Sequence, residues 1–134
     1  MVSKVFPATD DALNDAIAFV EEQLDLLDCP LKIVMQITVC VEEMFVNVAH
    51  YAYGEGTGDV EMVMDSENGV VAITLIDSGM PFDPLAKADP DITLSAEERN
   101  IGGLGIYMVK KSMNAVSYDR IDGKNIFTMK KNLL

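Results

Sequence analysis

The sequence predicts an α+β fold, a two-layer sandwich in which a mostly antiparallel sheet carries three helices on one face. Two pairs of strand patterns are each separated by a two-residue turn, Asn68-Gly69 and Asp122-Gly123. Strands joined by such short turns must run antiparallel. Three other segments carry apolar residues every three or four positions, which is typical of amphipathic helices. The predicted order is strand, helix, helix, strand, strand, irregular segment, helix, strand, strand.

The first third of the chain is expected to form a strand and two helices. Residues 2–6 form a short apolar strand pattern, and Thr9 or Asp10 can cap the helix that follows. The second helix is expected to start at Asp28. Pro30 then falls in its first turn, where the missing N–H has no structural cost.

The remaining boundaries follow from glycines and turn residues. The second helix is expected to run to about Ala52, because the glycine-rich segment 54–58 stops it. The later elements are strands at 59–65 and 70–77, an irregular segment at 78–101, a helix from 102 to about 114, and strands at 115–120 and 124–130.

The composition limits the classes of partner. The chain has 134 residues, which predicts a single domain spanning 1–134. Ten Lys and Arg residues against 22 Asp and Glu give a formal net charge of −12. Binding to nucleic acid or to an anionic membrane depends mostly on clustered basic residues, so neither is expected.

The two cysteines and the chain start favour a cytoplasmic protein. Cys29 and Cys40 lie within apolar helical patterns without a CxxC spacing, so buried free thiols are expected in a reducing compartment. No secretory h-region follows Lys4, and no run of 18 apolar residues could span a membrane.

A polar stripe interrupts the second predicted helix, which is otherwise apolar nearly all round and therefore expected to be buried on most of its circumference. Gln36, Glu43, Asn47 and His50 fall on one line, at spacings of seven, four and three, whereas Glu42 lies about 100° away. One interpretation is a solvated helix face. The other is a cavity lined by a carboxylate, an amide and an imidazole whose hydrogen bonds a ligand completes.

Two further motifs follow this helix in order. The first is Asp77-Ser-Gly79-Met-Pro81-Phe82, after the strand at 70–77, and the second is Gly102-Gly103-Leu104-Gly105-Ile106, at the start of a helix. Together with the Glu-x-x-x-Asn helix, they make the chain similar to the GHKL ATPases, which have the Bergerat fold. It resembles most closely the stand-alone anti-sigma factor serine kinases of bacteria, over residues 3 to 131.

The glycine motif suits phosphate binding by backbone amides, because glycines let N–H groups turn toward an anion at a helix N-terminus. It is not a P-loop, since no Gly-x4-Gly-Lys-Ser/Thr occurs. Between residues 33 and 109 the basic residues are Lys87 and Arg99, so ATP would need amide dipoles and Mg²⁺ to offset its charge. The resemblance implies that the amides of Gly102, Gly103, Leu104, Gly105 and Ile106 take this role.

The resemblance also implies an adenine-binding role for the second motif. The Asp at position 77 would accept a hydrogen bond from the exocyclic amine, which selects adenine over guanine. Gly79 would let the backbone approach the ring. Many relatives have a threonine in the last strand near the base; here Asn125 stands at that place and is expected to contact the nucleotide through water.

Two residues of the second predicted helix, Glu43 and Asn47, would act on the phosphates. By resemblance, Asn47 is the Mg²⁺ ligand through its side-chain oxygen, which suits a hard cation that keeps several waters. Glu43, one turn earlier, would orient and deprotonate the nucleophile, either water or a serine hydroxyl.

His50 and Tyr51 depart from the serine-kinase pattern. They look like the basic and aromatic pair with which sensor histidine kinases touch the phosphates, although a histidine packed at a helix end is the alternative. Residues 85–101, including Arg99, would form a short lid over the triphosphate, or else a solvated acidic loop.

The resemblance implies a Mg²⁺·ATP-dependent serine kinase that phosphorylates a STAS-type anti-anti-sigma partner. When that partner is absent it would sequester a sigma factor, and a homodimer through the first helix and strand is possible. One alternative is a nucleotide-responsive binding module without transfer activity. Another is a fragment of a sensor histidine kinase, but the chain has a single His, and no phosphoacceptor helix is expected before the domain. Topoisomerase and mismatch-repair relatives need much longer chains.

Overall fold

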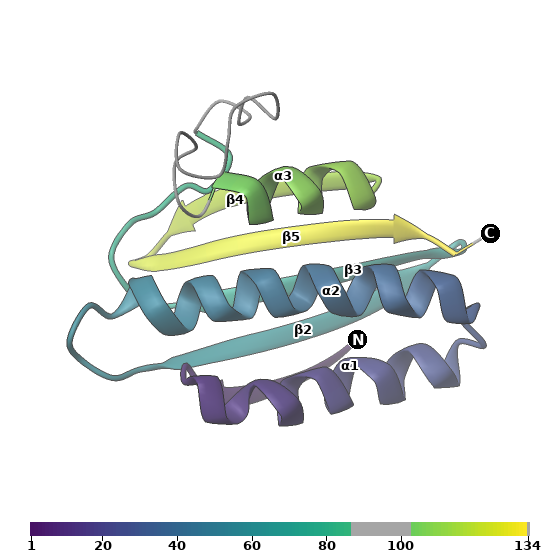
Figure 1. Cartoon of the computed structure of the whole chain (residues 1–134), viewed down its shortest axis with the longest axis horizontal. Helices are drawn as coiled ribbons and strands as arrows, with labels where there is room; N and C mark the ends of the chain where they lie inside the picture. Colours follow the sequence, from purple (N-terminus) through teal and green to yellow (C-terminus); the bar gives the residue numbers. More distant parts are fainter. Residues whose placement is uncertain (87–102, 134) are drawn as a thin grey trace.

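The computed structural model describes residues 1–86 and 103–133. One five-stranded sheet has the order β1-β2-β3-β5-β4, and every neighbouring pair runs antiparallel. Three helices pack on one face of this sheet, with α2 between α1 and α3 (Figure 1). This arrangement confirms the predicted α+β sandwich.

The elements agree with the predicted order. They are β1 (Val2–Pro7), the 3-10 turn η1 (Asp10–Ala12), α1 (Leu13–Leu26), α2 (Leu31–Asn47), the π-helical turn η2 (Val48–Ala52), β2 (Asp59–Glu67), β3 (Val70–Asp77), α3 (Gly103–Ser112), β4 (Ala115–Ile121) and β5 (Lys124–Asn132). The predicted irregular segment begins at residue 78 as expected, and its part from 87 to 101, which includes most of the predicted lid, lies outside the described residues.

Both predicted hairpin turns are present and set the register of the sheet. Asn68 and Asp122 have φ values of 53° and 52°, and the glycines after them both have φ of 78°. Positive φ at both central residues is the signature of a type I′ turn, whose twist matches that of the flanking strands. The second turn consequently pairs Arg120 with Asn125 across β4 and β5.

The predicted start of the second helix was wrong by three residues. Asp28 has a φ of 53° and donates its backbone N–H to the carbonyl of Asp25, so it ends α1 instead of opening α2. Pro30 occupies the N-cap position, with ψ of 142°, and α2 begins at Leu31. The cap of the first helix also differs: Thr9 precedes η1, and its side chain makes no capping hydrogen bond.

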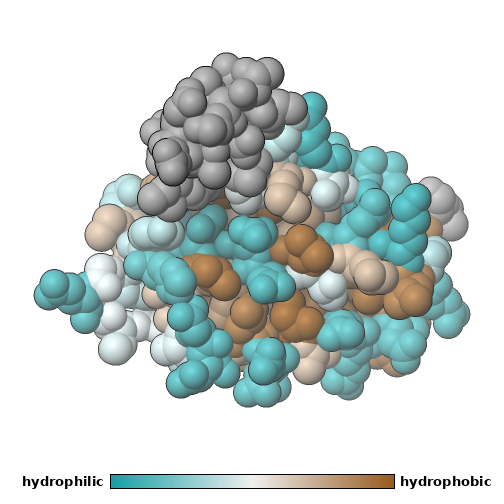
Figure 2. Space-filling view, in the orientation of Figure 1, coloured by the Kyte–Doolittle hydropathy of each residue, from teal (hydrophilic) through white to brown (hydrophobic). Residues whose placement is uncertain are grey.

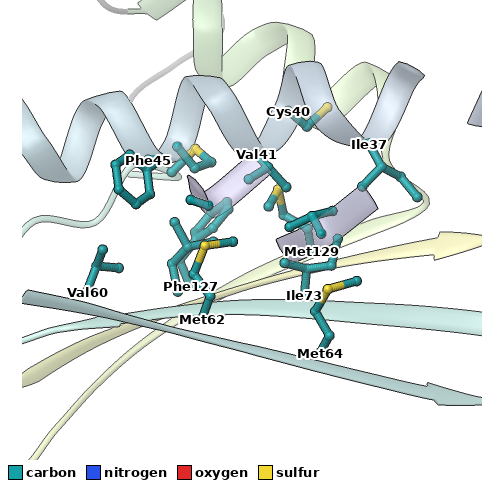
Figure 3. Close-up of a cluster of buried hydrophobic side chains, with 14 of the residues drawn as sticks. Ile37, Cys40, Val41, Phe45, Val60, Met62, Met64, Ile73, Phe127 and Met129 are labelled. Atoms are coloured by element: carbon teal, nitrogen blue, oxygen red, sulfur yellow. The ribbon is translucent and has the colours of Figure 1, made fainter. Parts of the chain in front are cut away.

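The main core lies between α2 and the sheet, where Phe45, Val41 and Ile37 face Met62, Ile73 and Met129 (Figure 3). Phe45 is completely buried and meets the ring of Phe6 edge-on, with centroids 6.5 Å apart.

The outer face of α2 is less buried than its composition predicted. Leu31, Met35 and Val39 are exposed to 74%, 61% and 44%. Hydrophobic side chains accordingly appear among hydrophilic ones on the helical face of the molecule (Figure 2). None of the described helices combines the length and apolar character required to cross a membrane.

Candidate functional site

A pocket opens where the C-terminal end of α2 meets the ends of β3, β4 and β5. Its empty volume is about 400 Å³, part of which is open to solvent. Its polar side chains come from both layers, with Asn47 and Tyr51 on the helical side and Asp77, Tyr118 and Asn125 on the sheet. The rest of the lining is apolar: Met44, Val48, Ala52, Phe82, Pro84 and Phe127. An apolar slot with a few convergent polar groups is the usual form of a small-molecule site.

Asp77 lines this pocket and is 6% exposed. Its Oδ1 accepts two hydrogen bonds, from the backbone N–H of Gly79 at 2.9 Å and from Nδ2 of Asn125 at 2.9 Å. No described residue hydrogen-bonds to Oδ2 of Asp77. A carboxylate oxygen is an acceptor only, so Oδ2 is suited to a ligand that offers an N–H.

Asn125 joins Asp77 to the loop that follows it. Besides its bond to Asp77, the side-chain amide donates to the carbonyl of Met80 at 2.8 Å. Its oxygen accepts hydrogen bonds from the Tyr118 hydroxyl and from the backbone N–H of Phe82. Asn125 is 5% exposed, so these protein contacts account for a buried polar side chain.

The loop after Asp77 packs tightly against the end of the α2 layer. A Cβ on Gly79 would stand 2.2 Å from the carbonyl oxygen of Ala52, so only glycine fits there. The N–H of Met80 donates to that same oxygen at 2.8 Å, and Arg120 Nη1 donates to the Gly79 carbonyl at 2.8 Å. The requirement for glycine at position 79 therefore has a structural cause within the protein, and its predicted approach to an adenine ring stays a prediction.

Glu43 and Asn47 lie one turn apart on α2, both half-buried. Asn47 lines the pocket, and no described residue hydrogen-bonds to its side chain. Glu43 faces the first turn of α3, because a Cβ on Gly105 would stand 2.4 Å from its Oε2. Glu42, the neighbouring carboxylate, is exposed. The tertiary structure thus brings Glu43 to the glycine motif, 62 positions away along the chain.

The π-helical turn η2 separates His50 from the polar stripe. A π-helix holds more residues per turn than an α-helix, so the α-helical spacing that aligned His50 with Asn47 does not continue beyond residue 47. Tyr51 lines the pocket, whereas Nε2 of His50 lies 2.8 Å from Oδ1 of Asp10 in η1. Of the two residues expected at the phosphates, the structure brings only Tyr51 into the pocket.

The glycine motif is described only in part. Arg99 and Gly102 lie outside the described residues, and α3 begins at Gly103 and continues through Leu104. Ile106 is 9% exposed and belongs to the hydrophobic core, so its side chain packs against the protein interior.

Tyr118 and Arg120 were not predicted as site residues. Both lie on β4 on the same side as Asn125, and both hydrogen-bond around Asp77 and its loop. The sequence contained a signal for both residues. The two-residue turn Asp122-Gly123 places Arg120 opposite Asn125, and Tyr118, two residues earlier, lies on the same side of β4.

No group of three or more His, Cys, Asp or Glu side chains suited to a metal occurs within residues 1–86 and 103–133. An all-protein cage is therefore not present in this part of the chain. Mg²⁺ does not need one, since it is commonly held by one or two protein oxygens, waters and substrate phosphates. The side-chain oxygen of Asn47, unpaired among the described residues, fits such a role.

The fold and the pocket agree with the family that comparison of the sequence identifies. The sequence profile of the histidine kinase-like ATPase domain matches residues 6–131, and the chain belongs to this family. The resemblance to GHKL ATPases expected from the three motifs is thereby confirmed, and membership of an ATPase family implies that the chain binds ATP.

Among individual relatives, the serine/threonine-protein kinase BtrW of Bordetella bronchiseptica is 27% identical over 94 residues. The match covers 69% of this chain and 66% of that protein, slightly less than two thirds of its length.

Two solved structures share the fold. One contains the RsbU and RsbW domains of a Mycobacterium tuberculosis protein; it has a TM-score of 0.65 at 16% identity and covers 99% of this chain and 33% of that one. The other is the SiaB–SiaC complex of Pseudomonas aeruginosa, with a TM-score of 0.61 at 18% identity, covering 98% and 89%.

Proposed function

We propose that this chain is a Mg²⁺·ATP-dependent protein serine kinase of the anti-sigma factor type, formed by one domain spanning residues 1–134. The observation that carries the proposal is the position of Glu43. Its carboxylate lies against Gly105, at the first turn of α3, and one helical turn before Asn47. In this proposal Glu43 is the base, Asn47 the metal ligand and the amides at the start of α3 the phosphate-binding groups, and their neighbouring positions would suit phosphoryl transfer.

Each side chain has one task in this proposal. Oδ2 of Asp77 accepts the adenine amine, and the apolar lining of the pocket packs on the ring. Asn47 holds Mg²⁺, which would neutralise charge on the phosphates. The backbone amides at the start of α3 bind the phosphates, and Tyr51 contacts them from η2. Glu43 takes the proton of the attacking serine hydroxyl.

The proposed partner is the one expected for a kinase of the anti-sigma factor type. We infer that the substrate is a serine on a STAS-type anti-anti-sigma protein, and that the chain binds a sigma factor when this partner is absent. A homodimer belongs to the same proposal. Support comes from the relatives, one named as a serine/threonine-protein kinase and another solved as a complex of SiaB with SiaC.

The test compares Glu43→Gln with Glu42→Gln, a matched control because Glu42 is the adjacent carboxylate and is exposed. Transfer of radiolabelled γ-phosphate is measured to STAS-type proteins encoded in the same genome and to their Ser→Ala variants. Glu43→Gln should keep its affinity for ATP and lose about 10²–10⁴-fold in transfer rate, the usual contribution of a general base.

Glu42→Gln should transfer phosphate at the wild-type rate. Undiminished transfer by Glu43→Gln would assign the base to another residue. If the wild type binds ATP but phosphorylates no candidate, the chain is a nucleotide-responsive binding module instead of a kinase.

A further inference from the structure

All the donors and acceptors of the Asn125 side-chain amide form hydrogen bonds with other groups of the protein. An amide offers two donor hydrogens and two acceptor lone pairs. The donors go to Asp77 Oδ1 at 2.9 Å and to the Met80 carbonyl at 2.8 Å. The acceptor positions take the Tyr118 hydroxyl and the N–H of Phe82. No position of the amide remains for a nucleotide, although the residue lines the pocket.

These partners also fix which way the amide points. Turning the amide over would set its oxygen against two acceptors, the Asp77 carboxylate and the Met80 carbonyl. It would also set its NH₂ group against the N–H of Phe82, which can only donate. One orientation of Asn125 therefore satisfies every partner.

The orientation of the Asp77 carboxylate, in contrast, depends on few hydrogen bonds. The torsion that turns a carboxylate is broad, so its oxygens exchange positions unless hydrogen bonds prevent it. Within the described residues Oδ1 has two donors, the N–H of Gly79 and Nδ2 of Asn125. Without Asn125, a single backbone donor two residues away would remain.

We infer that Asn125, held by Tyr118, is a positioning residue that fixes the Asp77 carboxylate with Oδ2 toward the ligand. The pair thereby sets the preference for a purine with a 6-amino group. This inference rests on the proposed binding of ATP at Asp77. It replaces the expected contact between Asn125 and the nucleotide with an indirect role, and it assigns Tyr118 to the same function.

The experiment measures base selection, not affinity alone. Wild type, Asp77→Asn, Asn125→Leu and the double variant are titrated with ATP and with purine riboside 5′-triphosphate, which lacks the 6-amino group. The wild type should prefer ATP by about tenfold or more, the usual cost of leaving a buried charged acceptor unpaired. Asp77→Asn and Asn125→Leu should each reduce this preference about tenfold.

The double variant tests whether Asn125 acts through Asp77. If Asn125 acts through Asp77, the double variant should have the same ratio of affinities as Asp77→Asn alone, because the two changes remove one shared interaction. Asn132→Leu, an exposed position of the same strand, is the matched control and should keep the wild-type ratio. Asn125→Thr, whose hydroxyl can still donate one hydrogen bond to Asp77, should recover part of the preference.

Thermal unfolding without nucleotide identifies a variant that fails to fold. If Asn125→Leu does, Tyr118→Phe replaces it, and it should narrow the ratio a few-fold. Equal loss of both triphosphates with an unchanged ratio would overturn the inference, as would additive losses in the double variant. If Asp77→Asn loses selection and Asn125→Leu keeps it, only this inference fails. If the wild type binds neither triphosphate, the proposed function fails and the inference with it.

Discussion

The Glu43 carboxylate of α2 occupies the space that a side chain on Gly105 of α3 would fill, with Oε2 2.4 Å from the position of that Cβ. The neighbouring atom belongs to the far end of a flexible side chain and can move. A different situation holds at Gly79, where the obstructing atoms belong to the backbone of Ala52. Glycine at 105 is therefore a requirement of the Glu43 position more than of the fold.

Gly105→Ala should consequently displace Glu43 while leaving the protein folded. We expect phosphate transfer to fall at least tenfold, because a base displaced from its geometry loses most of its contribution. Thermal unfolding and a transfer assay measure the two effects. Met108→Ala, an exposed change in the same helix, is the control and should alter neither. Full transfer by Gly105→Ala would mean that the observed position of Glu43 is not the working one.

Asn47→Ala should remove most of the Mg²⁺-dependent gain in ATP affinity, about tenfold or more, because it deletes the proposed metal ligand. Binding of ATP in EDTA and binding of adenosine should change little. Titrations with and without Mg²⁺ measure both. Gln36→Ala, another half-buried amide on the same helix, should keep the wild-type Mg²⁺ dependence. An equal Mg²⁺ effect in Asn47→Ala and wild type would exclude Asn47 as the ligand.

Phe45→Ala should lower the free energy of unfolding by about 3–5 kcal/mol, the usual cost of removing a buried aromatic ring and leaving a cavity. Phe45 is completely buried between α2 and the sheet. Urea unfolding followed by circular dichroism measures the change. Leu26→Ala, at a position 73% exposed, should change stability by less than about 0.5 kcal/mol.

The two thiols should differ in reactivity. Burial raises the pKa of both above the ordinary value of 9.0, although a hydrogen bond from Ser112 and the charge of Lys131 oppose the increase in the pKa of Cys40. Both cysteines were expected to be buried, but only Cys40 is, at 2% exposed, whereas Cys29 is half-buried. A disulfide reagent at pH 8 should therefore label Cys29 in the folded protein and Cys40 only after unfolding. Two fast-reacting thiols in the native state would contradict this burial.

The sign of the Cys40 effect on stability follows from linkage. Its folded pKa lies above its unfolded pKa, so the folded state binds the proton more tightly. The contribution of the neutral thiol is complete below pH 9 and decreases as the pH rises through the folded pKa. Urea unfolding at pH 8 and pH 10 should show a larger loss of stability in the wild type than in Cys40→Ala, which retains only the contribution of Cys29.

Local patterns determined much of the fold. The turns Asn68-Gly69 and Asp122-Gly123 gave antiparallel pairing and register, because a two-residue turn with positive φ allows one alignment. The helix at 28–52 was predicted from its apolar spacing, but its start was not, because Asp28 can either cap a helix or adopt the left-handed conformation that ends one. Only the packing of α1 against α2 selects between these conformations.

For the site, the sequence by itself determined which residues could serve: three motifs in order, each with its own local chemistry. The tertiary structure decided which of them meet. Glu43 and Gly105 come together because α2 and α3 pack side by side, and His50 leaves the stripe because η2 changes the helical period. The protein partners of Asn125 were equally invisible along the chain, because hydrogen bonds among three strands and a loop depend on distances that no local pattern encodes.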